Sequence, residues 1–466
     1  MLFNTPEYLL FFLVVLTASW CTVGVPRLRI WVLLLGSYYF YASNNHWLIL
    51  LLIATTHIDW LAGLYISRAK EQRVRKLWLA ASMSLNVGML AYFKYINFFA
   101  SSAVALAEHL GLRLGWVDLH VILPVGISFY TFQSMTYTID VYRRVIPAET
   151  NWCRFTFFVA YFPHLIAGPI VRASVFLHQI GEHPRLDAEA LDEALMRIFR
   201  GLFKKVVLAD FLAGYADKAF ADPQGAGLLM AWVGMYAFAF QIYYDFSGYT
   251  DLALGCARLM GFKLSENFNR PYSCGSFSDF WRRWHITLSE WLRDYLYIPL
   301  GGSRTGSGPR NLINLLVTMM LCGLWHGAAW TFVFWGTLHG LLLVAERALG
   351  LHKDRSQPSA WRSLIMLQLV AFTWLPFRAK DFGNLVDYCG ALFAGRPGMP
   401  LTVGMLAVLA IAAGGWLVQY LAGRHRLGQA FLRAPLALRA AAYACCWILV
   451  MVFNSGGAKT FIYFQF

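Results

Sequence analysis

The chain has 466 residues, of which 58% are hydrophobic and only 14% are charged. Soluble globular proteins carry about 25% charged residues, so this composition excludes a soluble particle of this size and predicts that lipid covers much of the surface. The net charge of +14 would suggest nucleic acid binding in a soluble protein. Basic residues also collect in cytoplasmic loops and near anionic lipid headgroups, and we therefore set nucleic acid aside.

The eight cysteines have no metal or redox spacing. There is no CxxC motif, and the one adjacent pair, Cys445 and Cys446, lies inside an apolar run. Cysteines in apolar surroundings are mostly structural. The sequence therefore predicts no metal site and no disulfide framework.

Apolar stretches long enough to span a bilayer, about 17–25 residues each, follow one another along the chain. They cover 7–25, 28–43, 47–66, 77–93, 95–112, 121–139, 152–170, 195–220, 228–248, 311–324, 328–349, 361–378, 384–394, 401–421 and 435–454. Several are short or broken by Gly and Pro, which is typical of re-entrant or bundle-buried segments. The fold class predicted is an all-α polytopic membrane protein with about 10–13 membrane helices. The first stretch lacks a basic n-region and a cleavage site, so we interpret it as a retained span.

The early loops indicate an orientation. Arg27 and Arg29 fall between the first two spans, and five basic residues fall between the third and fourth, at 68–76. Two helices separate these loops, so they lie on the same side of the membrane. The basic bias makes that side cytoplasmic, and it places the N-terminus outside.

The stretch 266–310 is unusually polar for this chain. At helical period it has two faces. The apolar stripe comprises Phe277, Trp281, Trp284, Leu288, Trp291 or Leu292, and Tyr295, and the polar face comprises Arg282, Arg283, Ser289, Glu290, Arg293 and Asp294. Ser276, followed three residues later by Asp279, resembles a capping box with Asp in place of Glu. The pattern predicts an amphipathic helix over 277–296 at the cytoplasmic interface, or entering the bundle from it.

His285 falls on the apolar side of this predicted helix, four residues after Trp281 and three before Leu288. A histidine in this position can be a functional residue. It can equally be a structural one, satisfied by a backbone carbonyl beneath the helix. The position alone favours the structural alternative.

His326 interrupts the almost wholly apolar stretch LCGLWHGAAWTFVFWGTLHG at 321–340. An ionisable residue at membrane depth is costly and marks a functional site by default. Burial disfavours the imidazolium, so we expect a neutral ring that can accept a proton. This suits a general base in acyl transfer, a role worth about 10²–10⁴ in rate. The alternative is a histidine hydrogen-bonded between helices, and for His339 we prefer that alternative.

Six further polar residues lie in apolar surroundings: His57, Asp59, Asp140, His164, Asp245 and Asp251. For Asp245 and Asp251 we expect ion pairs with Arg282, Arg283 or Arg293 that set the geometry of the bundle.

Two blocks carry a family resemblance. They are NFNRPYSCGSFSDFWRRWHITLSEWLRDYLYIPLGG at 267–302 and the His326 stretch. Together they resemble the membrane-bound O-acyltransferase (MBOAT) family, and more narrowly its bacterial alginate O-acetyltransferase type, including cellulose-acetylating relatives. Supporting stretches are LPVGISFYTFQSMTYTIDVYR (123–143), FPHLIAGPIVR (162–172), YYDFSGYTDLALG (243–255) and the terminal FIYFQF.

The resemblance implies that His326 is catalytic and that His285 is the second functional histidine. It also implies one membrane-embedded domain, 1–466, with helices in a ring around a central funnel. Its parts would be N-terminal helices (1–180), a catalytic core (195–350) with the interfacial helix 277–296, and C-terminal helices (361–466). We expect a cytoplasmic donor, acetyl-CoA, with no bound cofactor. Periplasmic acetyl-transfer proteins would finish the modification of an exopolysaccharide outside the inner membrane.

Four alternatives stay open. The short polar segment after Leu421 leaves the polymer undefined and slightly favours cellulose or another exopolysaccharide over alginate. D-alanyl transfer to teichoic acid would use the same fold and histidines with an acidic carrier protein. A polysaccharide transporter would use His326 for binding, and the lack of visible repeats counts mildly against it. A covalent acetyl-enzyme would need Cys322, which more commonly fills space.

Overall fold

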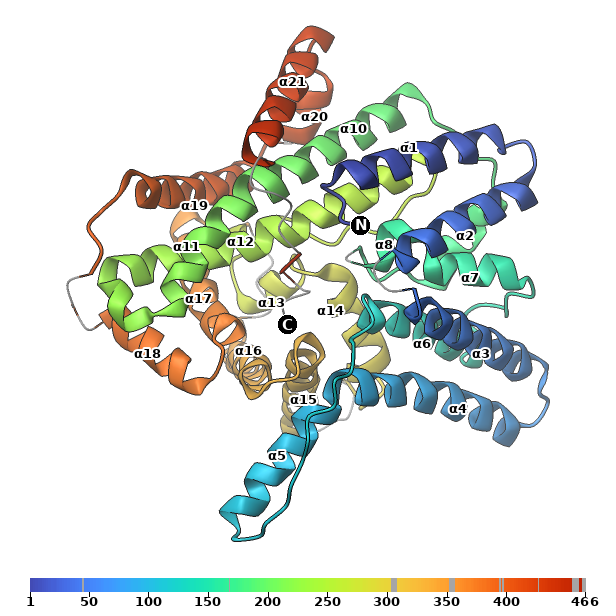
Figure 1. The fold of residues 1–466 in the computed structure, drawn as a ribbon, viewed down its shortest axis with the longest axis horizontal. Helices are drawn as coiled ribbons and strands as arrows, with labels where there is room; N and C mark the ends of the chain where they lie inside the picture. Colours follow the sequence, from blue (N-terminus) through green and yellow to red (C-terminus); the bar gives the residue numbers. More distant parts are fainter. Residues whose placement is uncertain are drawn as a thin grey trace. The chain divides into compact units, whose positions relative to one another are not determined.

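The structure, a computed structural model, describes the chain except residues 44–45, 167, 303–307, 352–356, 394, 396–397, 426, 455–460 and 463–466. Residue 167 and the last four residues of the FIYFQF stretch thus lie outside the described ranges. Helices dominate the described residues, and none of these residues belongs to a strand (Figure 1). The predicted all-α class is confirmed.

Six helices in the described part are long and apolar enough to cross a membrane. They are Leu48–Arg68, Gln72–His109, Pro223–Leu259, Ala360–Arg378, Val403–Ala422 and Leu436–Phe453, and Pro6–Cys21 is a shorter apolar helix. This pattern is that of a multi-pass membrane protein. The other apolar stretches form helices that fall short of these six in length or hydropathy, so the total of 10–13 membrane helices stays a prediction.

The chain forms two compact units. Unit 1 comprises Met1–Ala194 and Ala253–Ser265, and unit 2 comprises Leu195–Leu252 and Glu266–Phe466. Unit 1 contains α1 (Pro6–Cys21), α2 (Pro26–Ala42), α3 (Leu48–Arg68), α4 (Gln72–Leu90), a π-helical turn (Ala91–Tyr95), α5 (Ile96–His109), α6 (Ile127–Tyr142), α7 (Trp152–Ala160), α8 (Phe162–Leu165), α9 (Ala173–Phe176), a 3-10 turn (His178–Gly181) and the start of α10 (Ala188–Leu202). The predicted organisation as one membrane-embedded domain stays a prediction.

A buried carboxylate joins α3 to α4 in unit 1. Asp59 is fully buried and accepts hydrogen bonds from Ser82 at 2.6 Å and Asn86 at 3.0 Å. Buried polar groups must be paired to be tolerated, so this cluster fixes how the two helices pack.

The placement of Arg29 differs from the prediction. Helix α2 begins at Pro26, a residue pre-organised for the first helical turn. Arg29 therefore lies inside the helix and is buried, where its guanidinium donates to the carbonyl of Met260 and lies over the ring of Phe262. Of the two basic residues assigned to the first loop, only Arg27 is exposed.

Unit 2 contains the rest of α10, a π-helical turn (Phe203–Ala209), α11 (Asp210–Ala221), most of α12 (Pro223–Leu259), a 3-10 turn (Pro271–Ser273), α13 (Phe277–Trp281), α14 (Ile286–Leu292), a π-helical turn (Arg293–Tyr297), α15 (Gly308–His326), α16 (Trp330–Ala348), α17 (Ala360–Arg378), α18 (Phe382–Phe393), α19 (Val403–Ala422), α20 (Leu427–Leu432) and α21 (Leu436–Phe453). The sequence predicted one helix over 277–296, which is wrong: the helix is broken between Trp281 and Ile286.

The acidic residues of α12 form ion pairs, but with other partners than predicted. Asp245 pairs with Lys205 at 2.9 Å, and Asp251 pairs with Lys204 at 2.7 Å and with Arg200. The expected pairing with Arg282, Arg283 or Arg293 is wrong.

A close approach of two backbones explains these partners. A Cβ atom on Gly201 would lie 2.7 Å from the carbonyl oxygen of Gly248, so two glycines let α10 and α12 touch. The lysines just after Gly201 then reach the carboxylates that flank Gly248. Arg283 instead pairs with Asp279 at 2.9 Å, and Arg293 pairs with Asp294 at 2.7 Å.

Candidate functional site

His326 is the last residue of α15 and lies where α15 turns into α16. The two helices lie side by side (Figure 1). A Cβ atom on Gly323 would come within 2.2 Å of the carbonyl oxygen of Phe332, and one on Gly336 within 2.3 Å of that of Met319. Only glycine permits this contact, and the contact sets the position of His326.

Aromatic rings enclose the His326 imidazole. Ring centroids of Trp325, Trp335 and Phe377 lie 5.0, 5.2 and 5.3 Å from that of His326. The histidine is buried, with 4% of its surface exposed. These aromatic walls shield the imidazole from bulk water.

His285 lies beside His326, with the two ring centroids 6.5 Å apart. It is fully buried, and Phe246 packs edge-on against it at 4.8 Å. Trp325 is a neighbour of both histidines, at 6.0 Å from the His285 ring. The structure thus brings together the two histidines that the sequence singled out, which are 41 residues apart in the chain.

The backbone at His285 explains the broken helix. Its φ of 41° and ψ of 54° lie in the left-handed region, which a non-glycine residue adopts at a cost. The next two amides donate to Asn267 instead of continuing the helix: Ile286 to its carbonyl at 2.9 Å, and Thr287 to its Oδ1 at 3.3 Å. These bonds compensate the strain.

Asn267 also sets the tautomer of His285. Its Oδ1 accepts from the Thr287 amide and from the Thr287 hydroxyl at 2.9 Å, and it lies 3.1 Å from His285 Nδ1. An oxygen in this role needs a donor, so we assign the proton to Nδ1 and the acceptor lone pair to Nε2. Burial lowers the pKa of His285 to about 3, so the ring is neutral at physiological pH.

The sequence did not single out Asn267, although it opens the NFNRPY block. Its signal was weak, because an asparagine 18 residues before His285 has no local reason to contact it.

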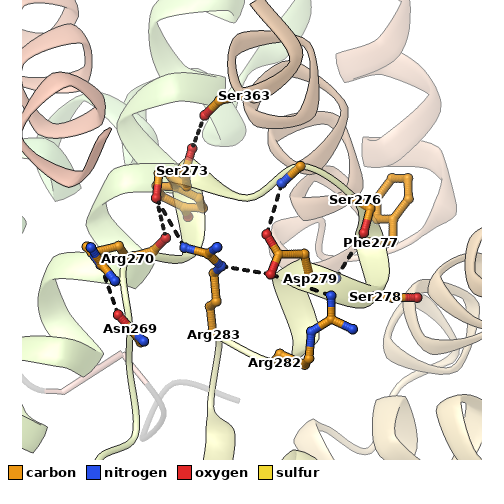
Figure 2. Close-up of polar contacts among 12 residues, drawn as sticks. Asn269, Arg270, Ser273, Ser276, Phe277, Ser278, Asp279, Arg282, Arg283 and Ser363 are labelled. Carbon is orange, nitrogen blue, oxygen red and sulfur yellow. Dashed lines mark hydrogen bonds and ion pairs between the residues drawn. The ribbon is translucent and has the colours of Figure 1, made fainter. Parts of the chain in front are cut away.

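A second residue overlooked is Glu346, whose carboxylate accepts from the amides of Phe277 at 3.0 Å and Ser278 at 2.8 Å at the start of α13. The predicted cap is present as well, since Ser276 accepts from the Asp279 amide at 3.1 Å (Figure 2).

His339 has the role preferred for it. Trp281 of α13 donates its indole N–H to His339 Nδ1 of α16 at 3.3 Å, so the interhelical hydrogen bond is confirmed.

Cys322 is fully buried in α15. His57, Asp59, Asp140 and His164 all lie in unit 1 and are not part of this cluster. No group of three or more potential metal ligands occurs among the residues that the structure describes.

Comparisons with known proteins place the chain. A family model described as MBOAT, membrane-bound O-acyltransferase family, matches residues 149–380, which include both histidines. The probable alginate O-acetylase AlgI of Pseudomonas aeruginosa is 42% identical, over 82% of this chain and 72% of the relative. The peptidoglycan O-acetyltransferase of Helicobacter pylori is 35% identical, over 82% and 77%.

A teichoic acid D-alanyltransferase of Streptococcus thermophilus is 31% identical, over 48% of this chain and 57% of the relative. The acetylating relatives thus match a much larger share of the chain than this D-alanyl-transferring one. The chain therefore belongs to the membrane-bound O-acyltransferase family and is a membrane-embedded acyltransferase.

Proposed function

We propose that this protein is a polysaccharide O-acetyltransferase. It passes an acetyl group from a cytoplasmic donor, acetyl-CoA, across the inner membrane to an exopolysaccharide such as alginate, cellulose or a similar polymer. The observation that carries this proposal is the pair of buried histidines, 6.5 Å apart between aromatic walls. The long matches to an alginate O-acetylase and to a peptidoglycan O-acetyltransferase support acetyl as the group transferred.

His326 is the general base of the proposed reaction. The accepting hydroxyl oxygen attacks the thioester carbonyl as its proton moves to the imidazole of His326. The carbon–sulfur bond then breaks, and the thiolate takes the proton from His326. The products are an ester and a free thiol, and the base is regenerated. A buried imidazole shielded from water suits such a base.

His285 is a positioning residue in this proposal. With Nδ1–H committed to Asn267, its Nε2 accepts hydrogen bonds and has no proton to offer an oxyanion. His285 is therefore poorly suited to stabilising negative charge on the thioester carbonyl. It is better suited to accepting a hydrogen bond from the substrate and so orienting it, either from the hydroxyl that is acetylated or from an amide N–H of the thioester arm. The tautomer therefore supports orientation of the substrate as the role of His285.

Two further points concern the partner proteins and the identity of the acyl group. The polymer lies outside the inner membrane, so we infer that periplasmic acetyl-transfer proteins complete the modification. D-alanyl transfer is the second candidate, supported by a match to under half of this chain. Binding of an acidic carrier protein in place of CoA would favour it.

The test is the acetyl content of secreted exopolysaccharide in cells that carry His326→Gln. His339→Gln is the matched control, since it alters a second buried histidine of the same hairpin and keeps an acceptor for Trp281. With equal protein levels in the membrane, we expect loss of acetyl groups in the first variant only, while polymer secretion continues. Normal acetylation in His326→Gln would exclude the proposed base. Loss of secretion itself would point to transport.

A further inference from the structure

A solvent-open recess is lined in part by residues close in sequence to His285 and Asn267, but it does not include either of them. Its lining comprises Arg270, Ser273, Arg283, Gln357, Pro358, Tyr420, Gly423 and Arg424. Three of these eight residues are arginines and none is acidic. The recess is therefore strongly positive.

The guanidinium of Arg283 is held in place from two sides. It donates to Asp279 at 2.9 Å and lies 3.5 Å from the hydroxyl of Ser273, in the centre of the cluster in Figure 2. Asp279 is shared with Arg282 at 3.6 Å. The single carboxylate of Asp279 thus forms ion pairs with two guanidinium groups, and part of the positive charge of Arg283 is left uncompensated.

The other two arginines have neutral neighbours. Arg424 lies over the ring of Tyr420 at 3.9 Å and donates to the carbonyl of Pro358 at 3.4 Å. Arg270 donates to the side-chain oxygen of Asn269 at 2.9 Å. Among the residues that the structure describes, neither arginine forms an ion pair with a carboxylate.

Both the backbone conformation and the charge of Arg270 are disfavoured where this residue lies. Its φ of 52° is in the left-handed region. Burial and the nearby Arg283 guanidinium lower the pKa of Arg270, which means that its charge is disfavoured where it lies. An anion between these guanidiniums would reverse that penalty. Arginine forks bind phosphate oxygens in pairs, and the Ser273 hydroxyl and Gln357 amide can donate further hydrogen bonds.

Two segments, 267–270 and 283–286, are hydrogen-bonded to each other and connect the recess to His285. Asn269 donates to the carbonyl of Arg283 at 2.9 Å, and Ile286 donates to that of Asn267 at 2.9 Å. Arg283 is two residues from His285, and Arg270 is three from Asn267. Because a fully extended chain spans at most about 3.3–3.6 Å per residue, the arginines lie no more than roughly 7–11 Å along the chain from the residues that form the histidine site.

Charge indicates the side of the membrane. The recess lies where α17 begins and α19 ends, and Arg362 adds a further positive charge there through its bond to the carbonyl of Gly275. Around the connection that leads into α17 the sequence has four basic residues (Arg347, Lys353, Arg355 and Arg362), against two at its opposite end (Arg378 and Lys380). The positive-inside rule assigns the recess to the cytoplasmic side, where phosphorylated thioesters are available.

We propose that this recess binds the phosphate groups of the acyl donor, so that the thioester arm extends from the arginines toward His285. This rests on the proposed function and adds the residues that recognise the donor. A lipid headgroup phosphate has the same chemistry, and the experiment below separates the two sources.

The test uses the purified full-length protein in nanodiscs of phosphatidylcholine, with equilibrium binding of acetyl-CoA as the readout. We expect Arg270→Gln and Arg424→Gln each to raise the Kd about tenfold, the size of one charge-assisted contact. Arg293→Gln is the matched control, because it removes the same charge from an arginine that pairs with Asp294 and neither lines the recess nor contacts Asp279. Acetyl-pantetheine, which has no phosphate, should bind wild type and all three variants equally weakly.

Three outcomes would overturn the proposal. The first is an unchanged Kd for acetyl-CoA in both recess variants. The second is equal sensitivity of acetyl-pantetheine to the substitutions. The third is a Kd that follows the phosphatidylglycerol content of the nanodisc and not the phosphates of the donor, which would assign the recess to lipid. Failure of the proposed function is seen separately, as normal polymer acetylation in cells with His326→Gln.

Discussion

The histidine cluster and the arginine recess share one stretch of chain but have opposite environments. Residues 267–286 supply Asn267 and His285 to the first, and Arg270 and Arg283 to the second. The first is buried and aromatic, which keeps an imidazole neutral. The second is open and cationic, which suits an anion. The contrast teaches that the proposed site of bond making and the proposed anion site are built separately, and that a short pair of segments connects them.

The largest effect is expected from replacing His326, and this substitution tests whether the histidine cluster and the arginine recess act independently. Replacement by Gln removes the proton acceptor and keeps much of the volume. We expect acetyl transfer to fall by about 10²–10⁴, with the affinity for acetyl-CoA unchanged. The rate of polymer acetylation and the Kd of the donor measure the two effects separately. A parallel loss of donor affinity would show that the two sites are not independent.

The glycine contact behind His326 gives the next effect. Gly323→Ala places a methyl group 2.2 Å from the carbonyl of Phe332, which forces α15 and α16 apart. Overpacking of this kind costs about 1–3 kcal/mol or more, and we expect a lower thermal unfolding temperature together with lower activity.

Gly414→Ala is the control for that substitution, since the helical position has nothing within 4 Å of the added methyl group. We expect it to leave stability unchanged or to raise it by up to about 1 kcal/mol. Equal destabilisation by the two substitutions would contradict the role assigned to Gly323.

A smaller effect, on pH dependence, is expected from Asn267→Asp. In the wild type, burial lowers the pKa of His285 to about 3, so its protonation does not limit activity between pH 5 and 7. A carboxylate in place of the amide favours the imidazolium and raises the pKa. The variant should lose activity as pH falls through this range, roughly tenfold or less. A pH–rate profile identical to wild type would contradict the contact.

The same pKa also affects stability. An unfolded histidine titrates near pH 6.5, and the folded state binds the proton only near pH 3. Between these values the unfolded chain holds more protons, so the contribution of His285 to stability is full above about pH 6.5 and falls as pH decreases. Unfolding midpoints of wild type and His285→Gln should therefore converge in acid. A difference that is constant with pH would be at odds with a neutral buried ring.

Much of this molecule follows from local sequence, and what does not depends on distant contacts. Apolar period and length were enough for the all-α class and for most of the long apolar helices, although the stretches predicted over 77–93 and 95–112 form one continuous helix, Gln72–His109. The cost of a buried ionisable group singled out His326. The break at His285 could not be predicted, because Asn267 takes the amides that would have continued the helix. The partners of Asp245 and Asp251 were missed for a related reason. They depend on the approach of Gly201 to Gly248, which no single stretch reveals.

The most direct test of the central claim uses inverted inner-membrane vesicles, whose outer surface is the cytoplasmic face. Labelled acetyl-CoA is added outside, and label is measured on the polysaccharide acceptor inside, with the periplasmic proteins of the system co-expressed. We predict transfer into the lumen with wild type and His339→Gln, and none above background with His326→Gln. Equal labelling with His326→Gln, or no labelling with wild type, would contradict acetyl transfer by this histidine pair.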